Sequence, residues 1–588
     1  MSGAPSLSER ETNLAASTSG TIVSSGLVRS ASPRLRVGLL IDSPSQPKWI
    51  WDIVRDIRDS STSEIVTVII DDAYGSEAPS GWRSFGVGHR HMLYSLYSKL
   101  DQRFFPTNLD VLAPTDIMSL LNGCTSVRLS SPNSNRENRL AHTDVEVILA
   151  QHLDVALHFG SRVLRGKALG IAKYGVWAYR HGTKPTAARS SVGFWEVMER
   201  RPVTTSMLYV LSDEDSAAKV IYRSSARTHP RSVRRNRTSA LSKASAFTIR
   251  KLRDLYEDGP VALESEPRHH LVTSQLDQAR PLPTNGEMLR FLSGLVRRYL
   301  KTRISHYLGT EQWFLAYDIQ RQLATPRTSL PAPTRMTPIF PPTDRFWADP
   351  FPVKKEGGYY VFFEERPSLT KKGFLSVLEI DDTGRVGVAT KVLEKPYHIS
   401  YPFVFEWESE YYLVPESAAN KTVELYRAVE FPYRWELDRV LLKNVNAVDA
   451  TIHQSQNRWW MFVNIALPGA SSCDELHIYH APTPRGPWVP HRRNPIKSDA
   501  SNARPAGRIF AESGEFYRPA QDCSTRYGAS IIINRIVRLD LESYEEIETS
   551  RILPDWQPNL IATHTINRVD RLTVVDAKRI RPRWRRSG

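Results

Sequence analysis

The stretch that organises this chain is RFWADPF, residues 345–351, because a series of similar segments follows it. These segments read GGYYVFFEE, SEYYLVPES, NRWWMFVNI and GEFYRPAQD, and they begin at residues 357, 409, 457 and 514. Taking Tyr359, Tyr411, Trp459 and Phe516 as equivalent, the spacings are 52, 48 and 57 residues. A repeat of roughly 40–50 residues made only of strands is typical of a β-propeller.

A second strand follows each of these segments, which supports the repeat. These strands are residues 374–380, 422–428, 475–481 and 527–536. A weaker fifth unit is HTINRVDRLTVVDA, residues 564–577, which reads as strand, turn and strand. We therefore predict an all-β, five-bladed β-propeller over residues 330–588, with residues 313–319 as a candidate strand to close the ring.

Length and charge limit the number of domains and the kinds of partner that the chain can have. With 588 residues, two or three domains are expected. The net charge of +15 fits attraction to a polyanion or an anionic membrane surface, and equally a solvated surface with basic tails. Because the chain has neither a zinc pattern nor a nucleic-acid-binding module, we predict no nucleic acid partner and no metal site.

The three cysteines, Cys124, Cys473 and Cys523, are scattered along the chain and suggest a reducing compartment. The polar start, MSGAPSLSERETN, does not resemble a signal peptide, and no apolar run reaches the roughly 18 residues of a membrane span. We predict a cytoplasmic protein, with peripheral docking at the inner face of the membrane left open.

The N-terminal part predicts a second domain. Residues 1–33 are rich in Ser, Thr, Ala and Gly and are expected to be disordered. A buried-strand pattern at residues 35–42, helical spacing at 49–57 and a second strand at 64–72 form a βαβ unit. We predict an α/β domain with a Rossmann-like parallel sheet over residues 34–258; a GxGxxG fingerprint is absent from it.

Within this domain, GVWAYRHG (residues 175–182) and GFWEVMERRPVTTSMLYVLSDEDSAAKVIY (193–222) resemble the catalytic half of the formyltransferase fold. That group includes methionyl-tRNA and sugar N-formyltransferases. The resemblance implies that His181 and Asp215 match a catalytic His and Asp, whereas Tyr179 replaces an Asn that holds the oxyanion. We expect a formyltransferase-like domain that no longer transfers formyl groups. The alternative is an active amino-sugar N-formyltransferase that uses 10-formyltetrahydrofolate.

Two basic segments follow. Six arginines fall within residues 223–237, which indicates a solvated face or a site for phosphates or anionic lipids. Residues 259–329 are predicted to be a linker with an amphipathic helix at 287–308. One face of that helix carries an apolar stripe and the other carries basic residues: Leu289, Leu292, Leu295, Val296 and Tyr299 against Arg290, Arg297, Arg298, Lys301 and Arg303. It packs between domains or lies on a membrane surface.

Acids recur near equivalent places of the propeller repeat. They are Asp349, Glu364, Glu365, Glu416, Asp449 and Asp522, and His564, Thr565 and Asn567 open the fifth unit. Small propellers gather polar side chains around one axial pocket, and carboxylates held together divide into acid and base roles. Each acid on its own is also explained by a strand cap or a nearby arginine.

The Ala-Asp-Pro-Phe and Val-Asp-Ala-Thr motifs resemble the five-bladed propellers of glycoside hydrolase family 43. That resemblance implies Asp349 as base or nucleophile and Asp449 as an orienting acid, with Glu416 or Glu365 as the proton donor. Substrate-binding candidates are Trp347, Arg518, Gln521, Asp522, His564 and Asn567.

A closer resemblance covers nearly all of the chain from about residue 35. The motifs FWADPF, FFEE, YPFVFE, YYLVPES, VELYRA, DAT and RPAQD resemble the N-terminal domain of plant glucosamine inositolphosphorylceramide transferase, a module that bacteria fuse to a formyltransferase-like domain. This implies a carbohydrate-active enzyme of surface polysaccharide or glycolipid biosynthesis, catalysing glycosyl transfer or hydrolysis without a cofactor. Its partner would be a sugar, nucleotide-sugar or glycolipid. A non-catalytic glycan-binding adaptor remains a third alternative.

Overall fold

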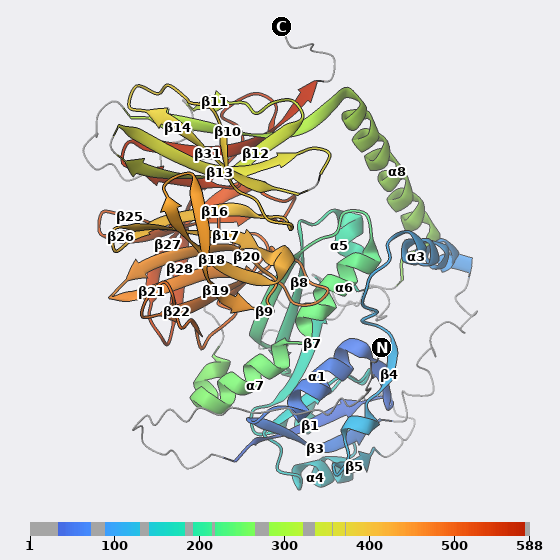
Figure 1. The fold of residues 1–588 in the computed structure, drawn as a ribbon. Coiled ribbons are helices and arrows are strands. Elements are labelled where there is room, and N and C mark those ends of the chain that lie inside the picture. Colours follow the sequence, from blue (N-terminus) through green and yellow to red (C-terminus); the bar gives the residue numbers. More distant parts are fainter. Residues whose placement is uncertain are drawn as a thin grey trace, which may run out of the picture.

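The computed structural model describes residues 33–71, 89–129, 140–182, 192–213, 218–264, 282–320, 336–355, 357–370 and 372–582. They form an α/β region and a ring of β-sheets, joined by one long helix (Figure 1). The predicted disordered tail lies outside the described residues, apart from Pro33. No helix among the described residues has the length and apolar character needed to cross a bilayer.

The N-terminal region is built on a seven-stranded sheet with the order β5-β3-β1-β6-β7-β8-β9. The strands are β1 (Leu35–Ile41), β3 (Ser63–Ile70), β5 (Thr125–Arg128), β6 (Val155–His158), β7 (Val176–His181), β8 (Val203–Val210) and β9 (Lys219–Arg227). Pairing is parallel from β5 to β7 and antiparallel from β7 to β9. A short antiparallel pair, β2 (Ser45–Pro47) and β4 (Pro114–Asp116), lies outside the sheet. The predicted parallel sheet is confirmed.

Helices cover both faces of this sheet. They are α1 (Lys48–Arg58), α4 (His142–Leu149), α6 (Val233–Ala244) and α7 (Phe247–Asp258), whereas α3 (Met92–Phe104) and α5 (Phe194–Glu199) belong to a separate cluster. On one face, apolar side chains of α1, α6 and α7 form one core with the sheet, and α4 belongs to the core of the other face. This is the two-sided cover that parallel strands require.

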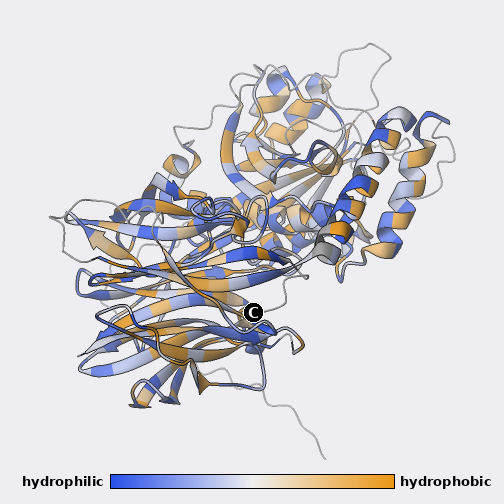
Figure 2. Cartoon of the chain, turned by 90° about the horizontal axis from the view of Figure 1, so that it is seen from above, coloured by the Kyte–Doolittle hydropathy of each residue, from blue (hydrophilic) through white to orange (hydrophobic). Residues whose placement is uncertain are grey.

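The C-terminal region is a five-bladed β-propeller, as predicted. The first four blades are β12–β15 (Arg345–Lys355, Gly358–Pro367, Phe374–Asp381, Thr390–Leu393), β16–β19 (Ser400–Trp407, Glu410–Ser417, Thr422–Glu430, Arg434–Lys443), β20–β24 (Ala447–Ser455, Arg458–Ile465, Glu475–Ala481, Val489–Pro490, Lys497–Ser498) and β25–β28 (Phe510–Glu512, Glu515–Asp522, Ser530–Leu539, Tyr544–Ile552). Figure 2 shows that the strands carry apolar residues interrupted by polar ones. Apolar clusters fill the space between neighbouring blades.

The fifth blade joins the two ends of the propeller sequence. Its order is β11 (Thr337–Ile339), β10 (Gly309–Ile319), β31 (Leu572–Pro582) and β29 (Leu560–Ala562), and β30 (Ile566–Val569) also pairs with β31. Strand β10 pairs with β31 from Gly309↔Pro582 to Ile319↔Leu572. Strand β10 contains residues 313–319, the candidate closing strand, and it lies in the segment assigned to the linker.

Helix α8 (Asn285–Leu308) leads into β10 and lies on the outside of the molecule (Figure 1). Its N-terminal half packs Met288 and Phe291 against α3 and α5. Six other apolar side chains of the helix are largely exposed: Leu289, Val296, Tyr299, Leu300, Ile304 and Tyr307. The helix is therefore a packed element at one end and an uncovered apolar surface along the rest.

Buried ion pairs attach the α/β region to the third blade. Lys243 of α6 lies 3.2 Å from Asp474, and both side chains are almost fully buried. Arg250 of α7 binds Glu475 through two contacts of 2.8 and 2.9 Å. The backbone of Ser225 in β9 also accepts a hydrogen bond from Ala500. These contacts fix the two regions against each other.

Candidate functional site

The inner strands of the first three blades share an unusual backbone feature. Asp349, Tyr401 and Asp449 have left-handed φ values of 55°, 44° and 55°, each where the register of the inner strand shifts against its neighbour. Left-handed backbone at a residue other than glycine costs of order 1–3 kcal/mol and clusters at functional sites. Three such residues at equivalent places mark this end of the propeller.

The acids at this end lie on the two inner strands of a blade. The sequence suggested the innermost strand alone. The aromatic segments of the repeat are the second strands, β13, β17, β21 and β26. Because neighbouring strands are antiparallel, the end of the second strand lies beside the start of the first. Ala348 is thus paired with Glu364, and Ser400 with Glu416.

Asp349 is buried in a network with the fifth blade. Its Oδ1 accepts a hydrogen bond from Thr565 Oγ1 at 2.8 Å and lies 3.5 Å from His564 Nε2, whereas His564 Nδ1 lies 2.7 Å from Asp576. Burial and the carboxylates of Asp449 and Asp576 raise the pKa of Asp349 to about 6, against the opposing effect of His564. Burial lowers the pKa of His564, but Asp576 and Asp349 outweigh it and raise that pKa to about 9.

Asp449 is bound by a guanidinium and an amide group in the same cluster. Arg504 binds it through Nε at 2.6 Å and Nη2 at 3.1 Å, and the amide of Gln521 donates to it at 2.7 Å. The same guanidinium lies 3.5 Å from Glu416. A two-pronged guanidinium contact fixes both the charge and the orientation of this carboxylate.

The surroundings of Glu416 and Glu364 disfavour their ionised forms. Burial and the nearby Asp449 raise the pKa of Glu416 to about 8. Burial, Asp349 and Glu416 raise the pKa of Glu364 well above its usual range. The Oε1 atom of Glu364 is buried without a hydrogen-bond partner and faces His398 at 3.8 Å. The cluster therefore combines protonated and ionised carboxyl groups.

Ligand atoms of Asp349, His564 and Asp576 lie within 4.8 Å of one another, a spacing that a metal ion can bridge. Asp576, however, already accepts hydrogen bonds from the backbone N–H groups of Asp349, His564 and Thr565. A His564 imidazole that is protonated at neutral pH has no lone pair for a metal. These residues therefore fit an ion-paired triad better than a metal site.

Two of the predicted site residues point elsewhere. Glu365 lies on the opposite face of β13, where it accepts hydrogen bonds from Arg345 at 2.6 Å and Ser376 at 2.7 Å. Successive side chains of a strand alternate between faces, so Glu364 rather than Glu365 belongs to the cluster. Trp347 packs on Phe363 in the apolar core that the first blade shares with the fifth.

Three further candidates have structural partners. Arg518 binds Glu546 through two contacts of 2.7 Å. Asp522 accepts hydrogen bonds from Ser524 and pairs with Arg551 at 2.8 Å. Asn567 bridges the backbones of Pro350 and Arg508 near the axis. Of the six substrate-binding candidates, the structure brings Gln521 and His564 into the cluster.

The sequence analysis missed four residues of the cluster: Tyr401, Arg504, Tyr527 and Asp576. Tyr401 donates to or accepts from Thr451 at 2.8 Å beneath the acids. Tyr527, which is 38% exposed, packs edge-on against His564, and Arg504 lies over its ring. Gly528 permits this approach, because a Cβ there would lie 2.5 Å from His564. The repeated Arg-Pro-Ala of residues 504–506 and 518–520 was an available signal for Arg504.

Cys473 and Cys523, which are far apart in the sequence, both lie near the acid cluster. Cys473 Sγ lies 4.0 Å from Arg504, and Cys523 Sγ lies 3.8 Å from Gln521 Oε1. Both are buried at the rim of the acid cluster.

The described part of the N-terminal candidate site is mainly aromatic. The hydroxyl of Tyr179 bonds to Thr248 at 2.7 Å and to the Ala244 carbonyl at 3.1 Å, and its ring stacks with Phe159 and Phe247. His181 Nδ1 contacts Ser206 at 3.0 Å, whereas its buried Nε2 has no partner. Burial lowers the pKa of His181 to about 4. Asp215 lies outside the described residues.

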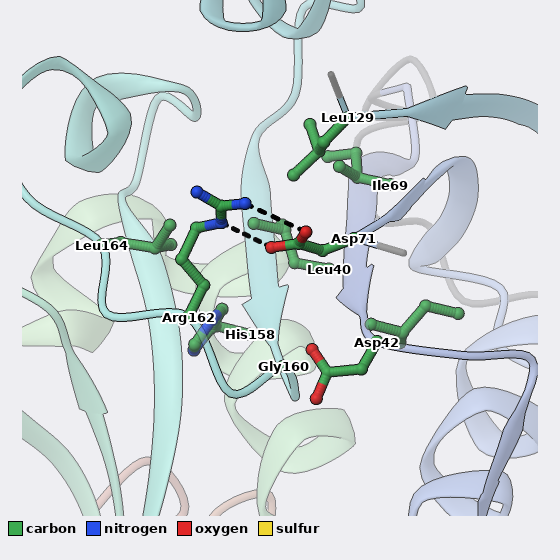
Figure 3. Close-up of a pocket in the computed structure, with 10 residues that line it drawn as sticks. Leu40, Asp42, Ile69, Asp71, Leu129, His158, Gly160, Arg162 and Leu164 are labelled. Atoms are coloured by element: carbon green, nitrogen blue, oxygen red, sulfur yellow. Dashed lines mark hydrogen bonds and ion pairs between the residues drawn. The ribbon is translucent and has the colours of Figure 1, made fainter. Parts of the chain in front are cut away.

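A small cavity of about 10 Å³ lies where β1, β3 and β6 end (Figure 3). Ligands of open α/β sheets often bind where the strand order reverses, as it does here between β1 and β6. The charged residues there already have partners: Arg162 binds Asp71, and Asp42 accepts two hydrogen bonds from Ser161. The cavity has room for about one water molecule.

Residues 336–574 match the family model "Glucosamine inositolphosphorylceramide transferase 1, N-terminal". Glucosamine inositolphosphorylceramide transferase 1 of Oryza sativa subsp. japonica is 38% identical over 209 residues, which is 34% of this chain and 28% of that protein. The chain thus matches little more than a quarter of the length of this relative.

Two solved structures are similar over parts of the chain. The family 117 glycoside hydrolase Zg3597 of Zobellia galactanivorans covers 45% of this chain and 90% of its own, at 11% identity and a TM-score of 0.30. Glycinamide ribonucleotide transformylase 1 of Symbiobacterium toebii covers 39% and 93%, at 14% identity and a TM-score of 0.25. Neither likeness bears on function at these TM-scores. The five-bladed propeller of this chain is therefore the part that is similar to the N-terminal domain of glucosamine inositolphosphorylceramide transferase 1.

Proposed function

We propose that the propeller is the catalytic module of a carbohydrate-active enzyme of surface polysaccharide or glycolipid biosynthesis. It would catalyse glycosyl transfer or glycosidic hydrolysis on a nucleotide-sugar or glycolipid. The observation that carries this proposal is the buried cluster of Asp349, Glu416 and Asp449, in which the pKa values of Asp349 and Glu416 differ and Arg504 binds Asp449. Carboxyl pairs of this kind supply the acid and base of glycosidic chemistry.

The surroundings assign a role to each carboxyl group. Glu416, with its pKa near 8, carries a proton at neutral pH and would donate it to the leaving oxygen. Asp349, with its pKa near 6, is mostly ionised and would act as base or nucleophile. Asp449 would orient substrate and stabilise positive charge, since Arg504 and Gln521 hold it in place.

Glu364 replaces Glu365 as the alternative proton donor in this proposal. Its raised pKa favours the protonated form, and its Oε1 has no hydrogen-bond partner among the described residues. A buried polar atom without a partner costs about 1–3 kcal/mol, which a substrate hydroxyl would relieve.

The matched family supports the substrate class. The relatives are named for transfer to inositolphosphorylceramide, a glycolipid precursor, and this chain shares the propeller part with them. Tyr527 adds an exposed aromatic face beside the cluster, which suits packing against a sugar ring.

We further propose that the α/β region is a formyltransferase-like domain that has lost formyl transfer. Tyr179 stands at the position of the oxyanion donor, and its hydroxyl is already hydrogen-bonded to Thr248 and to the Ala244 carbonyl. Formyl transfer from a folate donor would therefore lack this oxyanion donor. This favours the propeller over the amino-sugar N-formyltransferase alternative.

Ligand-dependent thermal unfolding of the full chain tests the proposal. Nucleotide-sugars, amino sugars, oligosaccharides and a reduced folate would be screened, because a ligand at a hundred times its Kd adds about 2.7 kcal/mol of stability. We expect a sugar to stabilise the protein and Asp349→Asn to abolish that effect. Asp382→Asn, the same change at an exposed propeller carboxylate, is the matched control.

Two outcomes would contradict the catalytic proposal. Stabilisation by folate that depends on His181 would restore formyl transfer. Sugar binding that survives Asp349→Asn, with no turnover by the native protein, would favour a glycan-binding adaptor.

We also propose that α8 rests on an anionic membrane surface, where a glycolipid substrate would reside. Its exposed apolar side chains include Val296, Leu300 and Ile304, each more than half exposed. Arginines and lysines accompany them: Arg290, Arg297, Lys301 and Arg303. An apolar face with cationic neighbours is the chemistry of an interfacial helix.

Vesicle sedimentation tests this surface. The triple variant Val296→Ser, Leu300→Ser, Ile304→Ser should lose at least about tenfold in partition to phosphatidylserine vesicles, since each buried apolar side chain contributes about 1.5–3 kcal/mol. Neutral phosphatidylcholine vesicles should bind the native protein weakly. Concentration-dependent dimerisation that the same variant abolishes would assign the surface to a second copy instead.

A further inference from the structure

A second polar site lies between the two regions of the molecule, outside the acid cluster. It is a cleft of about 400 Å³ between the start of α6 and the loop that follows β21. The α/β region contributes Arg227, His229, Arg231, Arg235 and Ser239, and the propeller contributes Ser471. The sequence analysis had singled out this run of arginines, and the proposed propeller chemistry does not use it.

The cleft concentrates positive charge without a compensating acid. Three guanidinium groups line it, and no carboxylate is among its lining residues. Arg231 and Arg235 are exposed, and the described part of the chain offers neither an ion-pair partner. The Nε of Arg227 is buried and lacks a hydrogen-bond partner among the described residues. Unpaired buried donors of this kind favour an anion with several acceptor oxygens.

The surrounding contacts hold these donors in place. The Arg235 guanidinium lies over the Phe105 ring, 5.4 Å from its centroid. His229 Nδ1 accepts from the backbone N–H groups of Ser232 and Arg231, at 3.0 and 3.4 Å, so its proton resides on Nε2. Burial and the three arginines lower the pKa of His229 to about 4, which makes it a neutral donor.

The start of α6 does not itself supply the binding groups. Ser232 caps the helix by accepting from the N–H of Arg235, and the N–H groups of Val233 and Arg234 donate to Tyr97 and Asp101. An anion in the cleft must therefore be bound by side chains, mainly by the planar forks of the arginines.

We propose that this cleft binds a phosphate or diphosphate group. Guanidinium groups pair with phosphate oxygens through two parallel hydrogen bonds, and three of them match the charge of a diphosphate better than that of a single carboxylate. The hydroxyls of Ser239 and Ser471 add neutral donors from the two sides. Both regions contribute, so the site exists only in the assembled chain.

The cleft opens at the same end of the propeller as the acids. Its propeller loop follows β21 as the Tyr527 loop follows β26, and equivalent strands run in the same direction. The next residues of that loop, Ser472 and Cys473, lie 3.3 and 4.0 Å from the Arg504 guanidinium that holds Asp449. If the proposed function holds, the ligand is the phosphate-bearing part of the substrate whose sugar reaches the acids.

Calorimetric titration of the full chain with inorganic pyrophosphate tests the site. The double variant Arg231→Ala, Arg235→Ala should weaken binding at least about tenfold, because it removes two charge-assisted contacts. Arg290→Ala, Arg297→Ala on α8 removes the same charge elsewhere and should change the Kd less than about twofold. Both pairs are exposed, so the thermal unfolding temperature should stay near that of the native protein.

Competition identifies the source of the phosphate. Displacement of pyrophosphate by a nucleoside diphosphate points to a soluble ligand, and displacement by phosphatidic acid vesicles points to a lipid headgroup. Ser471→Ala should weaken binding a few-fold, which shows that the propeller loop takes part.

Saturable pyrophosphate binding that both arginine pairs weaken equally would overturn the site, as would the absence of saturable binding. Asp349→Asn should leave the pyrophosphate Kd unchanged. Failure of the propeller chemistry and failure of the phosphate site are therefore distinguishable.

Discussion

The acid cluster of the propeller and the His181 site of the α/β region differ in the charged groups that surround their titratable residues. The propeller holds Asp349, Glu416 and Asp449 beside Arg504 and His564, within an ion-paired network. The α/β site holds a neutral histidine packed against Trp49 and Tyr179, whose hydroxyl is already bonded. Unequal pKa values favour proton transfer, whereas aromatic packing favours stability.

The difference shows that a matched motif is not sufficient evidence of a working site. His181 occupies the expected strand, yet its surroundings lower its pKa and leave no charged partner among the described residues. The propeller acids match their motifs no more closely than His181 does, yet ion pairs and burial give each carboxyl group distinct surroundings. The environment of the residues therefore carries the functional argument.

The largest expected effect separates the two sites by turnover. Asp349→Asn and Glu416→Gln should each lower turnover of a sugar substrate by about 10²–10⁴-fold, the usual contribution of a general acid or base. His181→Ala should change turnover less than about twofold. Rates would be measured on the substrate class found in the ligand screen, with Asp382→Asn as control. A His181 variant that is inactive beside an active Asp349 variant would reverse the comparison.

The second effect concerns the buried pair that joins the two regions. Asp474→Ala leaves the Lys243 ammonium buried and unpaired, which typically costs about 3–5 kcal/mol. Calorimetric scanning should show a large fall in the unfolding temperature. Lys354→Ala, which breaks a partly exposed pair with Asp382, should cost less than about 1 kcal/mol. Equal effects of the two variants would mean that the regions are not joined through this pair.

The third effect is the pH dependence of stability. Glu416 has a raised pKa and the folded state therefore binds more protons than the unfolded state between about pH 4.5 and 8, so stability should fall as pH rises through this window. His564 acts in the same direction between about pH 6.5 and 9, because its folded-state pKa is also raised.

Thermal unfolding between pH 5 and 9 measures this slope. Glu416→Gln removes one titrating group and should flatten the fall in unfolding temperature, most clearly below pH 8. His181→Gln should not flatten the fall: the lowered pKa of His181 opposes the fall below about pH 6.5, so its loss should steepen the slope there and leave the slope above pH 6.5 unchanged. A slope that Glu416→Gln does not alter would show that this carboxyl group ionises normally.

The smallest effect tests the aromatic filling of the α/β site. Tyr179→Phe removes the hydroxyl bonds to Thr248 and Ala244 and should cost about 1 kcal/mol. Chemical unfolding measures the change. Sugar turnover should stay unchanged, whereas a loss of turnover would give this region a part in the propeller chemistry.

The sequence was sufficient for the ring and for its principal acids. Blades that bury both faces need regular aromatic and apolar strands, and that repeat is visible in the residues. Asp349 and Asp449 were found because each stands in a short motif at the same place of its blade. The closing strand β10 was harder to assign, because it is separated from its partner β31 by the whole propeller.

The finer details depend on geometry that local patterns do not encode. Glu364 and Glu365 are adjacent, and only the face of β13 that meets the axis distinguishes them. Arg504 and Arg518 stand in the same Arg-Pro-Ala motif, yet one binds Asp449 and the other binds Glu546. Asp576 lies in the weakest repeat. No sequence motif there predicted the three hydrogen bonds that its carboxylate accepts from backbone N–H groups.

The pairing of β10 with β31 also governs how the chain matures. Strand β10 leaves the ribosome before β31, so this edge of β10 stays uncovered until β31 has been made. An uncovered strand edge invites pairing with other chains, so the nascent propeller is vulnerable to aggregation until β31 has been made. A chain that stops before Leu572 would leave β10 without its partner and the ring open, whatever the state of the acids.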